Sequence, residues 1–275
     1  MEIKVIASDL DGTLLDQYGQ YDKDRFERIL TQLEQKGIHF VVATGNKIER
    51  VNLIFQELSP RLSYVAENGG YVQTSSKILR QSQITQDDAL AFIDYFKESL
   101  VDYRVVLSTA HRSYVLDSVI FSKEHEMIEE EQWNAFLAHL EFVPNFEGVD
   151  FNHLTKINML VEKDTHQVIE RFNKNFKGNL RAVTSGYGAI DILPREVDKA
   201  SGLELLLKQW QLSPHQVMAF GDGENDRELL AMTPHSYAMA NAPESVKKVA
   251  LHRAPHHTED GVLQVIEEFL KDKGE

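Results

Sequence analysis

Short apolar segments that stop abruptly at polar residues are the feature of this 275-residue chain that most restricts its fold. Residues 5–7 are followed closely by Asp9, and residues 38–43 run directly into Thr44 and Gly45. Short continuous apolar runs are typical of strands in a parallel sheet that is covered on both faces. We therefore expect each run to be a buried strand that carries its polar residues at its carboxyl end.

Segments with helical periodicity separate these apolar runs. Phe26, Ile29, Leu30 and Leu33 recur at three- and four-residue steps behind a potential N-cap at Asp22. Similar stripes flank a later apolar run at residues 217–220, and residues 64–66 form a further short run. Strands that alternate with helices predict an α/β fold with a Rossmann-like parallel-sheet core.

The middle of the chain follows a different pattern. Longer apolar segments at residues 104–110, 113–116, 156–161 and 180–184 are interleaved with helical segments at 87–100, 124–140 and 165–176. This pattern predicts an inserted α+β domain. We expect the insertion to span residues 83–187, within a core domain formed by residues 1–82 and 188–275.

The composition limits the kinds of partner that the protein can bind and the compartment in which we expect it. A formal net charge of −14 argues against a nucleic-acid partner, because neutralising phosphates requires a basic face. The absence of cysteine excludes disulfides and thiolate metal sites. No stretch approaches the ~18 consecutive apolar residues of a membrane span. The first residues also lack the pattern of a secretory signal, so we expect a cytoplasmic protein without a membrane partner.

The segment Asp9-Leu10-Asp11-Gly12-Thr13 directly follows the first expected strand. Two carboxylates at the end of a buried strand are costly unless a cation pairs with them, and Mg²⁺ takes carboxylate and phosphate oxygens as ligands. An aspartate can attack a phosphate ester to give an aspartyl-phosphate, while a second acid protonates the leaving oxygen and later deprotonates water. The alternative is an Asx-type turn with solvated carboxylates.

Two other segments offer groups that suit a phosphate. Thr44 supplies a hydroxyl and Gly45 a backbone N–H at a strand end. Lys199, after Asp198, is expected in the first turn of a helix, where the helix dipole disfavours a cation, so a nearby phosphate would explain it. The alternatives are a simple helix N-cap at Thr44 or Asn46, and an exposed lysine on a solvated turn.

A further segment, residues 221–226, concentrates acids and an amide at a strand-to-helix junction. Asp222, Glu224, Asn225 and Asp226 supply the oxygen ligands that a hard cation requires. An acidic helix start, which the helix dipole favours, is the alternative. Because the carboxyl ends of parallel strands meet at one edge of a sheet, we expect these segments to converge on one site.

Taken together, the four segments resemble the motifs of the haloacid dehalogenase superfamily of phosphatases. Residues 9–13 match its first motif, residues 44–45 its second, Lys199 its third and residues 221–226 its fourth. The large insertion between the second and third motifs and the stretch at residues 67–70 are similar to the Cof-type branch, subclass IIB. Residues 183–188 and 198–202 also resemble the bacterial sugar phosphatases of that branch.

The resemblance implies Mg²⁺-dependent hydrolysis of small phosphate monoesters, sugar phosphates above all, through an aspartyl-phosphate on Asp9. Asp9 would be the nucleophile and a Mg²⁺ ligand together with Asp222 and the backbone carbonyl of Asp11. Asp11 would be the general acid and base, and Asp226 would orient water or Lys199. The groups implied to hold the phosphate are Thr44, Gly45, Lys199, Asn225 and the backbone N–H of Leu10.

Several points stay open within this resemblance. Many Cof-type members carry arginine where this chain has Asn46, whereas the sugar-phosphatase-like members that it resembles share asparagine. Asn68-Gly69 could be no more than a tight turn between residues 64–66 and 71–73. The insertion is implied to be a cap that closes over the site and sets specificity.

Two other functions would use the same residues. A phosphomutase on sugar phosphates would pass the phosphoryl group from Asp9 back to a sugar hydroxyl. A non-catalytic module would keep the pocket and bind a phosphate ligand, which the intact set of acids and Lys199 argues against. In each case the expected partner is a small phosphate ester, and we expect a monomer or a weak homo-oligomer.

Overall fold

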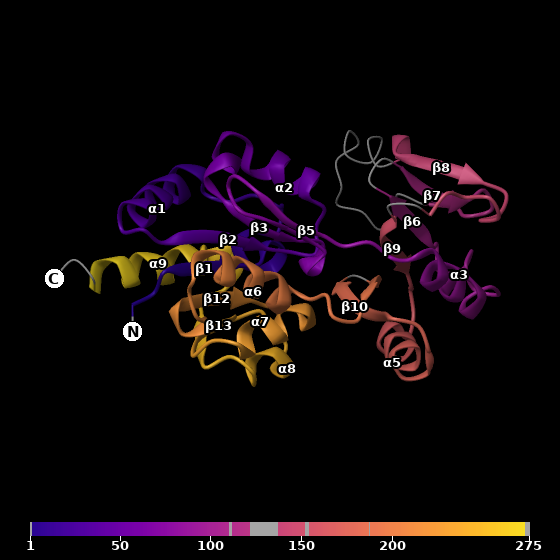
Figure 1. Ribbon diagram of the computed structural model, residues 1–275. Helices are drawn as coiled ribbons and strands as arrows, with labels where there is room; N and C mark the ends of the chain where they lie inside the picture. Colours follow the sequence, from indigo (N-terminus) through magenta and orange to yellow (C-terminus); the bar gives the residue numbers. More distant parts are fainter. Residues whose placement is uncertain (1, 110–111, 122–136, 152–153, 187, 273–275) are drawn as a thin grey trace. The chain divides into compact units, whose positions relative to one another are not determined.

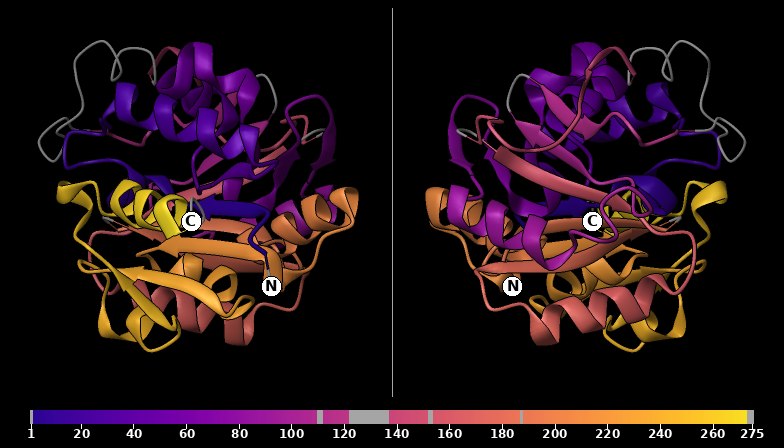
Figure 2. Two further views of the ribbon diagram at one scale, coloured as in Figure 1. Left: turned by 90° about the vertical axis from the view of Figure 1, so that its left-hand side faces the viewer. Right: turned by 90° about the vertical axis from the view of Figure 1, so that its right-hand side faces the viewer.

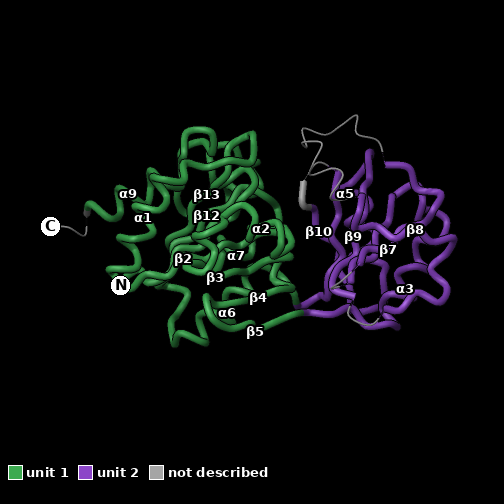
Figure 3. The backbone as a smooth tube through the Cα atoms, turned by 90° about the horizontal axis from the view of Figure 1, so that it is seen from above, with its two compact units in different colours: residues 1–81, 197–275 green, residues 82–196 purple. Residues whose placement is uncertain are grey.

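The computed structural model of the protein (Figure 1) describes residues 2–109, 112–121, 137–151, 154–186 and 188–272. The chain divides into two compact units, a core unit formed by Met1–Gln81 and Val197–Glu275 and an inserted unit formed by Ser82–Glu196 (Figure 3). Each unit has its own sheet and its own hydrophobic core. No helix among the described residues has the length and apolar character needed to cross a bilayer.

An eight-stranded sheet lies at the centre of the core unit. Its strand order is β14-β13-β12-β1-β2-β3-β4-β5, in which the first six strands are parallel and the last two are antiparallel to their neighbours. The predicted α/β fold with a parallel-sheet core is therefore confirmed. The strands are β1 (Val5–Ser8), β2 (His39–Ala43), β3 (Ser63–Ala66), β4 (Tyr71–Gln73), β5 (Ile78–Gln81), β12 (Val217–Gly221), β13 (His235–Met239) and β14 (His252–Ala254).

Helices cover both faces of this sheet (Figure 1), which explains why its central strands β1 and β12 are buried at every residue. In β1, Ile6 packs into one hydrophobic cluster, while Val5 and Ala7 pack into the cluster on the other face. The first face is covered by α1 (Lys23–Gln35), α2 (Ile48–Phe55) and α9 (Gly261–Asp272), and the second by α6 (Lys199–Trp210), α7 (Arg227–Ala231) and α8 (Glu244–Lys247).

Helix α1 shows how the sequence sets these elements. Asp22 caps it by accepting a hydrogen bond from Arg25 N at 2.9 Å, as predicted. The predicted stripe of Phe26, Ile29 and Leu30, together with Leu33, is fully buried against the sheet. The amphipathic spacing therefore fixes which side of the helix faces the core.

The inserted unit is built on a six-stranded sheet of order β10-β11-β9-β6-β7-β8. Helices α3 (Gln86–Tyr95) and α5 (Thr165–Asn175) lie in front of this sheet in the right-hand view of Figure 2, and they share one hydrophobic cluster with it. The strands are β6 (Val106–Thr109), β7 (Ser113–Leu116), β8 (Leu140–Val143), β9 (Leu154–Leu160), β10 (Leu180–Gly186) and β11 (Ala189–Pro194).

Two details of the insertion differ from the expectation. The second boundary lies after Glu196 instead of residue 187, because β11 pairs with β10 and β9 and so belongs to the inserted sheet. The helix expected at residues 124–140 falls mostly on residues 122–136, which lie outside the described chain, and β8 already begins at Leu140.

The two places where the chain enters and leaves the insertion are joined within the core unit. Arg80, in the last strand before the insertion, donates hydrogen bonds to Gly69 O at 3.2 Å and to Ser201 Oγ at 3.1 Å. Ser201 lies in the first turn of α6, just after the chain returns. This contact ties the departing and returning segments together.

Candidate active site

Five neighbouring parallel strands of the core sheet (Figure 1) end in polar residues at one edge. The predicted residues Asp9, Thr44 and Asp222 follow β1, β2 and β12. Two more, Asn68 after β3 and Asn241 after β13, complete the row. Asn241 was not predicted as a site residue, because the strand at residues 235–239 was not recognised from the sequence. Had that strand been recognised, the pattern of polar residues at strand ends would have indicated Asn241.

The loop after β1 is a wide turn over Leu10–Leu14 that is closed by a hydrogen bond from Leu15 N to Leu10 O at 2.9 Å. Gly12 has a φ of +73°, and a Cβ there would lie 2.4 Å from Asp222 Oδ2. Thr13 Oγ1 donates to Asp222 Oδ1 at 2.9 Å. A glycine is therefore required for the loops after β1 and β12 to meet.

Lys199 is the first residue of α6 and is only 1% exposed. Its Nζ lies 2.9 Å from Asp9 Oδ1 and 2.6 Å from Asp226 Oδ1. The alternative of an exposed lysine is thus wrong. Lys199 does not follow a strand of the core sheet; it enters the site from the N-terminus of α6, which Asp198 caps.

Asp226 uses both of its carboxylate oxygens within the site. Oδ1 accepts from Lys199, and Oδ2 accepts from the backbone N–H groups of Asp222 at 3.0 Å and Gly223 at 2.9 Å. Asp226 therefore holds the ammonium group and shapes the loop after β12. These contacts agree better with the predicted role of Asp226 in orienting Lys199 or water than with a role as a metal ligand.

The electrostatics of the cluster reflect a shortage of positive charge. Burial, followed by the nearby Asp226, raises the pKa of Asp9 well above its ordinary value, although Lys199 opposes this. Burial and Asp226 also raise the pKa of Asp222 to about 6. Burial alone would lower the pKa of Lys199, but Asp226 and Asp9 outweigh it and raise that pKa. The ammonium group therefore stays charged, and one cation faces three carboxyl groups.

The donor atoms of this cluster fit Mg²⁺. One carboxylate oxygen from each of Asp9, Asp222 and Asp226 lies within 4.8 Å of the others. These are hard oxygen ligands, and a divalent cation would compensate the charge that Lys199 leaves over. Asp226 already accepts three hydrogen bonds, one of them from the Lys199 ammonium group, so Asp9 and Asp222 are the side chains better placed to take an ion.

The Asp11 side chain makes contacts different from those of Asp9. Its Oδ2 accepts from Asn46 Nδ2 at 2.6 Å, and its Oδ1 lies 3.2 Å from the Arg50 guanidinium. Arg50 also donates to Asn46 Oδ1 at 2.7 Å. An arginine one helical turn after Asn46 thus brings a guanidinium to Asp11, a contact that sequence reasoning missed.

Thr44 and Asn46 are joined at the end of β2. Thr44 Oγ1 accepts hydrogen bonds from the Asn46 backbone N–H at 3.1 Å and from its Nδ2 at 3.0 Å. Because the hydroxyl oxygen is engaged as an acceptor, its own proton can be donated to a bound group. Thr44 is therefore oriented by Asn46 in a way that suits an anionic ligand.

Asn68 belongs both to a hairpin turn and to the candidate site. β3 and β4 pair antiparallel around it, as the turn interpretation predicts. Its Oδ1 also accepts from Asn225 Nδ2 at 2.9 Å, and a Cβ on Gly45 would lie 3.2 Å from Asn68 Nδ2. Gly69 packs so closely that a Cβ there would lie 2.0 Å from Asp198 O. The hairpin thus gathers the predicted phosphate-binding residues Gly45 and Asn225.

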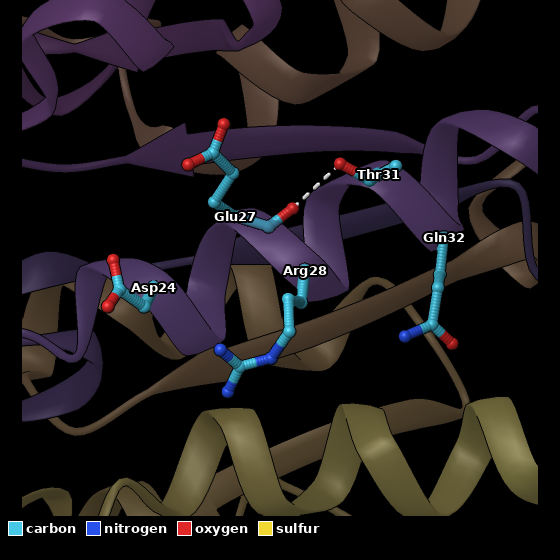
Figure 4. Close-up of a pocket in the computed structure, with 5 residues that line it drawn as sticks. All are labelled: Asp24, Glu27, Arg28, Thr31 and Gln32. Carbon is cyan, nitrogen blue, oxygen red and sulfur yellow. Dashed lines mark hydrogen bonds between the residues drawn. The ribbon is translucent and has the colours of Figure 1, made fainter.

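A shallow hollow elsewhere in the core unit has a different character. It lies over α1 and is lined by Asp24, Glu27, Arg28, Thr31 and Gln32 (Figure 4). All five come from one helix, and Thr31 Oγ1 donates back to Glu27 O at 2.9 Å. None of the residues predicted for the site lines this hollow, so the strand edge is the stronger candidate.

Comparison with known proteins identifies a family that matches most of this chain. The family described as haloacid dehalogenase-like hydrolase matches residues 6–266. The chain is 30% identical over 279 residues, covering 98% of it and 97% of the relative, to the 5-amino-6-(5-phospho-D-ribitylamino)uracil phosphatase YbjI of Escherichia coli strain K12.

Solved structures share the whole architecture. The crystal structure of SMU.1108c from Streptococcus mutans UA159 superposes with a TM-score of 0.86 at 32% identity, covering 98% of this chain and 100% of that one. The subclass IIB sugar phosphatase BT4131 has a TM-score of 0.74 at 19% identity, with 97% and 98% coverage, and so shares the fold.

Proposed function

Because this chain belongs to the haloacid dehalogenase-like hydrolase family and is a phosphatase that hydrolyses phosphate monoesters, we propose that it acts with Mg²⁺ through an aspartyl-phosphate on Asp9. One observation carries the proposal. Lys199 is buried between Asp9 and Asp226 at the strand edge, where Asp222 leaves further negative charge to be compensated by a cation.

In the first half of the reaction, an oxygen of Asp9 attacks the phosphorus atom and the bond from phosphorus to the leaving oxygen breaks. Lys199 holds Asp9 Oδ1 at 2.9 Å, and the described residues give the other oxygen no hydrogen bond, which leaves it available for attack. Asp11, in its acid form, gives its proton to the leaving oxygen, so an alcohol departs.

In the second half, Asp11 takes a proton from water while the water oxygen attacks the phosphorus atom. The bond between phosphorus and Asp9 breaks, inorganic phosphate is released and the Asp9 carboxylate is restored. Bound Mg²⁺, held by Asp9, Asp222 and the Asp11 carbonyl, would neutralise charge on the phosphoryl oxygens.

The phosphoryl group itself would be held by donors around the strand edge. The hydroxyl of Thr44 and the ammonium of Lys199 offer protons, and Asn225 lies beside Gly45 through its bond to Asn68. Positioning and charge stabilisation are what a loose phosphoryl-transfer transition state requires. We assign phosphate binding to Thr44, Gly45, Lys199, Asn225 and the backbone N–H of Leu10.

For the substrate, we propose a small sugar or sugar-alcohol phosphate. The name of the E. coli relative describes a phosphate ester of a ribityl chain, which is a polyol, and BT4131 is named as a sugar phosphatase. The inserted unit would supply the contacts to the polyol, as expected of a cap.

A phosphate-release screen tests the proposal. It would compare hexose, pentose and ribityl phosphates, nucleotides and flavin mononucleotide, with and without EDTA. We expect release from a sugar or polyol phosphate that stops in EDTA and returns with Mg²⁺. Full activity in chelator would remove the metal from the scheme, and an isomerised sugar phosphate without free phosphate would indicate a mutase.

The intermediate is tested with Asp9→Asn and a matched control, Asp24→Asn, which removes an exposed carboxylate on α1. Acid quenching during turnover of a ³²P-labelled substrate should leave label on the wild-type protein and on the control, but not on Asp9→Asn. Turnover by Asp9→Asn at the wild-type rate would rule out Asp9 as the nucleophile. If wild type binds beryllofluoride, which mimics the phosphoryl group, but turns over no ester, a non-catalytic binding module would be favoured.

A further inference from the structure

Asn241 occupies the site although the proposed reaction gives it no part. It lies just after β13, and its Nδ2 donates to Gly12 O at 2.8 Å and to Asp222 Oδ2 at 3.1 Å. Its Oδ1 accepts from the backbone N–H of His257 at 3.3 Å. One side chain thus connects the loops after β1, β12 and β13 with the turn before α9.

The Asp222 carboxylate is held on both oxygens by uncharged donors. Thr13 Oγ1 donates to Oδ1 at 2.9 Å, and Asn241 donates to Oδ2 at 3.1 Å. Neither donor removes the negative charge of Asp222, so the pair leaves that charge available to an ion. The two hydrogen bonds fix the orientation of the Asp222 carboxylate plane.

The chemistry of the amide explains why asparagine stands at position 241. Gly12 O and Asp222 Oδ2 each need a donor, while the N–H of His257 needs an acceptor, and only an amide offers two donor protons and an acceptor on one short side chain. These backbone partners also fix which end of the amide faces Asp222.

The loop after β1 is anchored from the same side by a second contact. His257 Nδ1 lies 2.8 Å from Leu15 O, at the end of the loop after β1. The turn before α9 therefore contacts this loop at Leu15, while Asn241 contacts it at Gly12. The distance from Asp9 to Asp222 is therefore set by bonds that cross between elements distant in sequence. A metal site needs its ligands held in this way.

We propose that Asn241 is a positioning residue that orients the Asp222 carboxylate for Mg²⁺ and holds it against the loop after Asp9. The inference rests on the proposed function in that the site must take Mg²⁺. Asn241 contacts neither substrate nor phosphate in this role. Its loss should weaken the ion's binding more than the chemistry that follows once the ion is bound.

Calorimetric titration of the metal-free protein with Mg²⁺, without substrate, tests this. Asn241→Ala should raise the Mg²⁺ Kd by roughly 10- to 100-fold, the usual cost of losing a partner that orients a ligand. The Mg²⁺ concentration for half-maximal activity should rise in parallel, while kcat at saturating Mg²⁺ stays within a few-fold of wild type. A purely structural role would not produce this split.

Asn173→Ala is a matched control in the inserted unit. Asn173 also makes two bonds through its amide, to Ala182 O at 2.9 Å and from Ala182 N at 2.7 Å, far from the acidic cluster in sequence and in a different unit. It should lower the melting temperature but leave the Mg²⁺ Kd unchanged. Asn241→Asp, which keeps the acceptor for His257 and loses both donations, provides a second variant if Asn241→Ala does not fold.

The outcomes separate this inference from the proposed function. An unchanged Kd in either Asn241 variant, in a protein whose wild type binds Mg²⁺, would overturn the positioning role alone. A wild type that binds no Mg²⁺ and is fully active in EDTA would overturn both. An equal rise of Kd in Asn173→Ala would show a general effect of lost stability and would also refute the inference.

Discussion

Removing the charge of Asp222 should stabilise the metal-free protein while it destroys the ion site. A carboxyl group whose pKa rises from 3.8 to about 6 is ~3 kcal/mol harder to ionise in the folded protein than in the unfolded chain. Asp222→Asn removes this cost. Because the group is mostly buried, with burial as the main cause, solvent does not screen the cost away.

The hydrogen bonds of Asp222 set what the substitution loses. Asn241 can still donate to the new amide oxygen, and the Thr13 hydroxyl can turn to accept from the new N–H. Bonds between neutral groups are weaker than those to a carboxylate, at a cost of about 1 kcal/mol. The net gain is then about 1–2 kcal/mol, which for a unit of this size raises Tm by roughly 2–8 °C.

The pH dependence follows from the sign of the pKa change. Below pH 3.8 Asp222 is protonated in both the folded and the unfolded state, so the ionisation cost is absent there and Asp222→Asn should have no advantage over wild type. The advantage of the variant should grow as pH rises from 3.8 to about 6 and be complete above that. Asp9, whose pKa is also raised, titrates in both proteins and largely cancels in the comparison.

Differential scanning calorimetry in EDTA measures this difference, with the core-unit transition followed at about pH 8 and about pH 4. Added Mg²⁺ should raise the Tm of wild type and leave that of Asp222→Asn unchanged, because a ligand stabilises only the state that binds it. Asp24→Asn controls for the loss of one exposed charge. A variant less stable than wild type in EDTA at pH 8 would refute the reasoning.

Two further substitutions probe neighbouring contacts. Lys199→Met leaves Asp9 and Asp226 without their buried partner, so we expect it to lower the free energy of unfolding by roughly 3–5 kcal/mol and to abolish turnover; chemical denaturation that shows no loss would contradict the buried pair. Arg50→Gln should free one oxygen of Asp11 and lower kcat by about 3- to 30-fold with little change in stability, whereas Arg28→Gln on α1 should not; equal kcat in both variants would remove Arg50 from the positioning of Asp11.

Residues at strand ends were predictable because one physical rule places them. Asp9 and Asp222 follow short apolar runs, and parallel strands present their carboxyl ends at one edge. Asn241 follows the same rule, but its strand, His235–Met239, mixes polar and apolar residues, so its pattern gave no strand signal. In β11, the buried Asp191 interrupts the apolar run in a similar way.

Contacts between residues that lie far apart in the sequence could not be predicted from local sequence patterns. Nothing near Lys199 in sequence indicates that it is buried between Asp9 and Asp226, which lie 190 residues before it and 27 after it. The bond from Arg50 to Asp11 likewise joins two residues that lie 39 positions apart in the sequence. Such contacts follow from the packing of elements, which periodicity alone does not determine.

The hydrogen bond from Arg80 to Ser201 joins the two segments of the core unit between which the inserted unit lies in the sequence. All residues of the acidic cluster lie in the core unit. We therefore expect that residues 82–196 can vary in length and sequence while Asp9, Asp222 and Asp226 keep their positions.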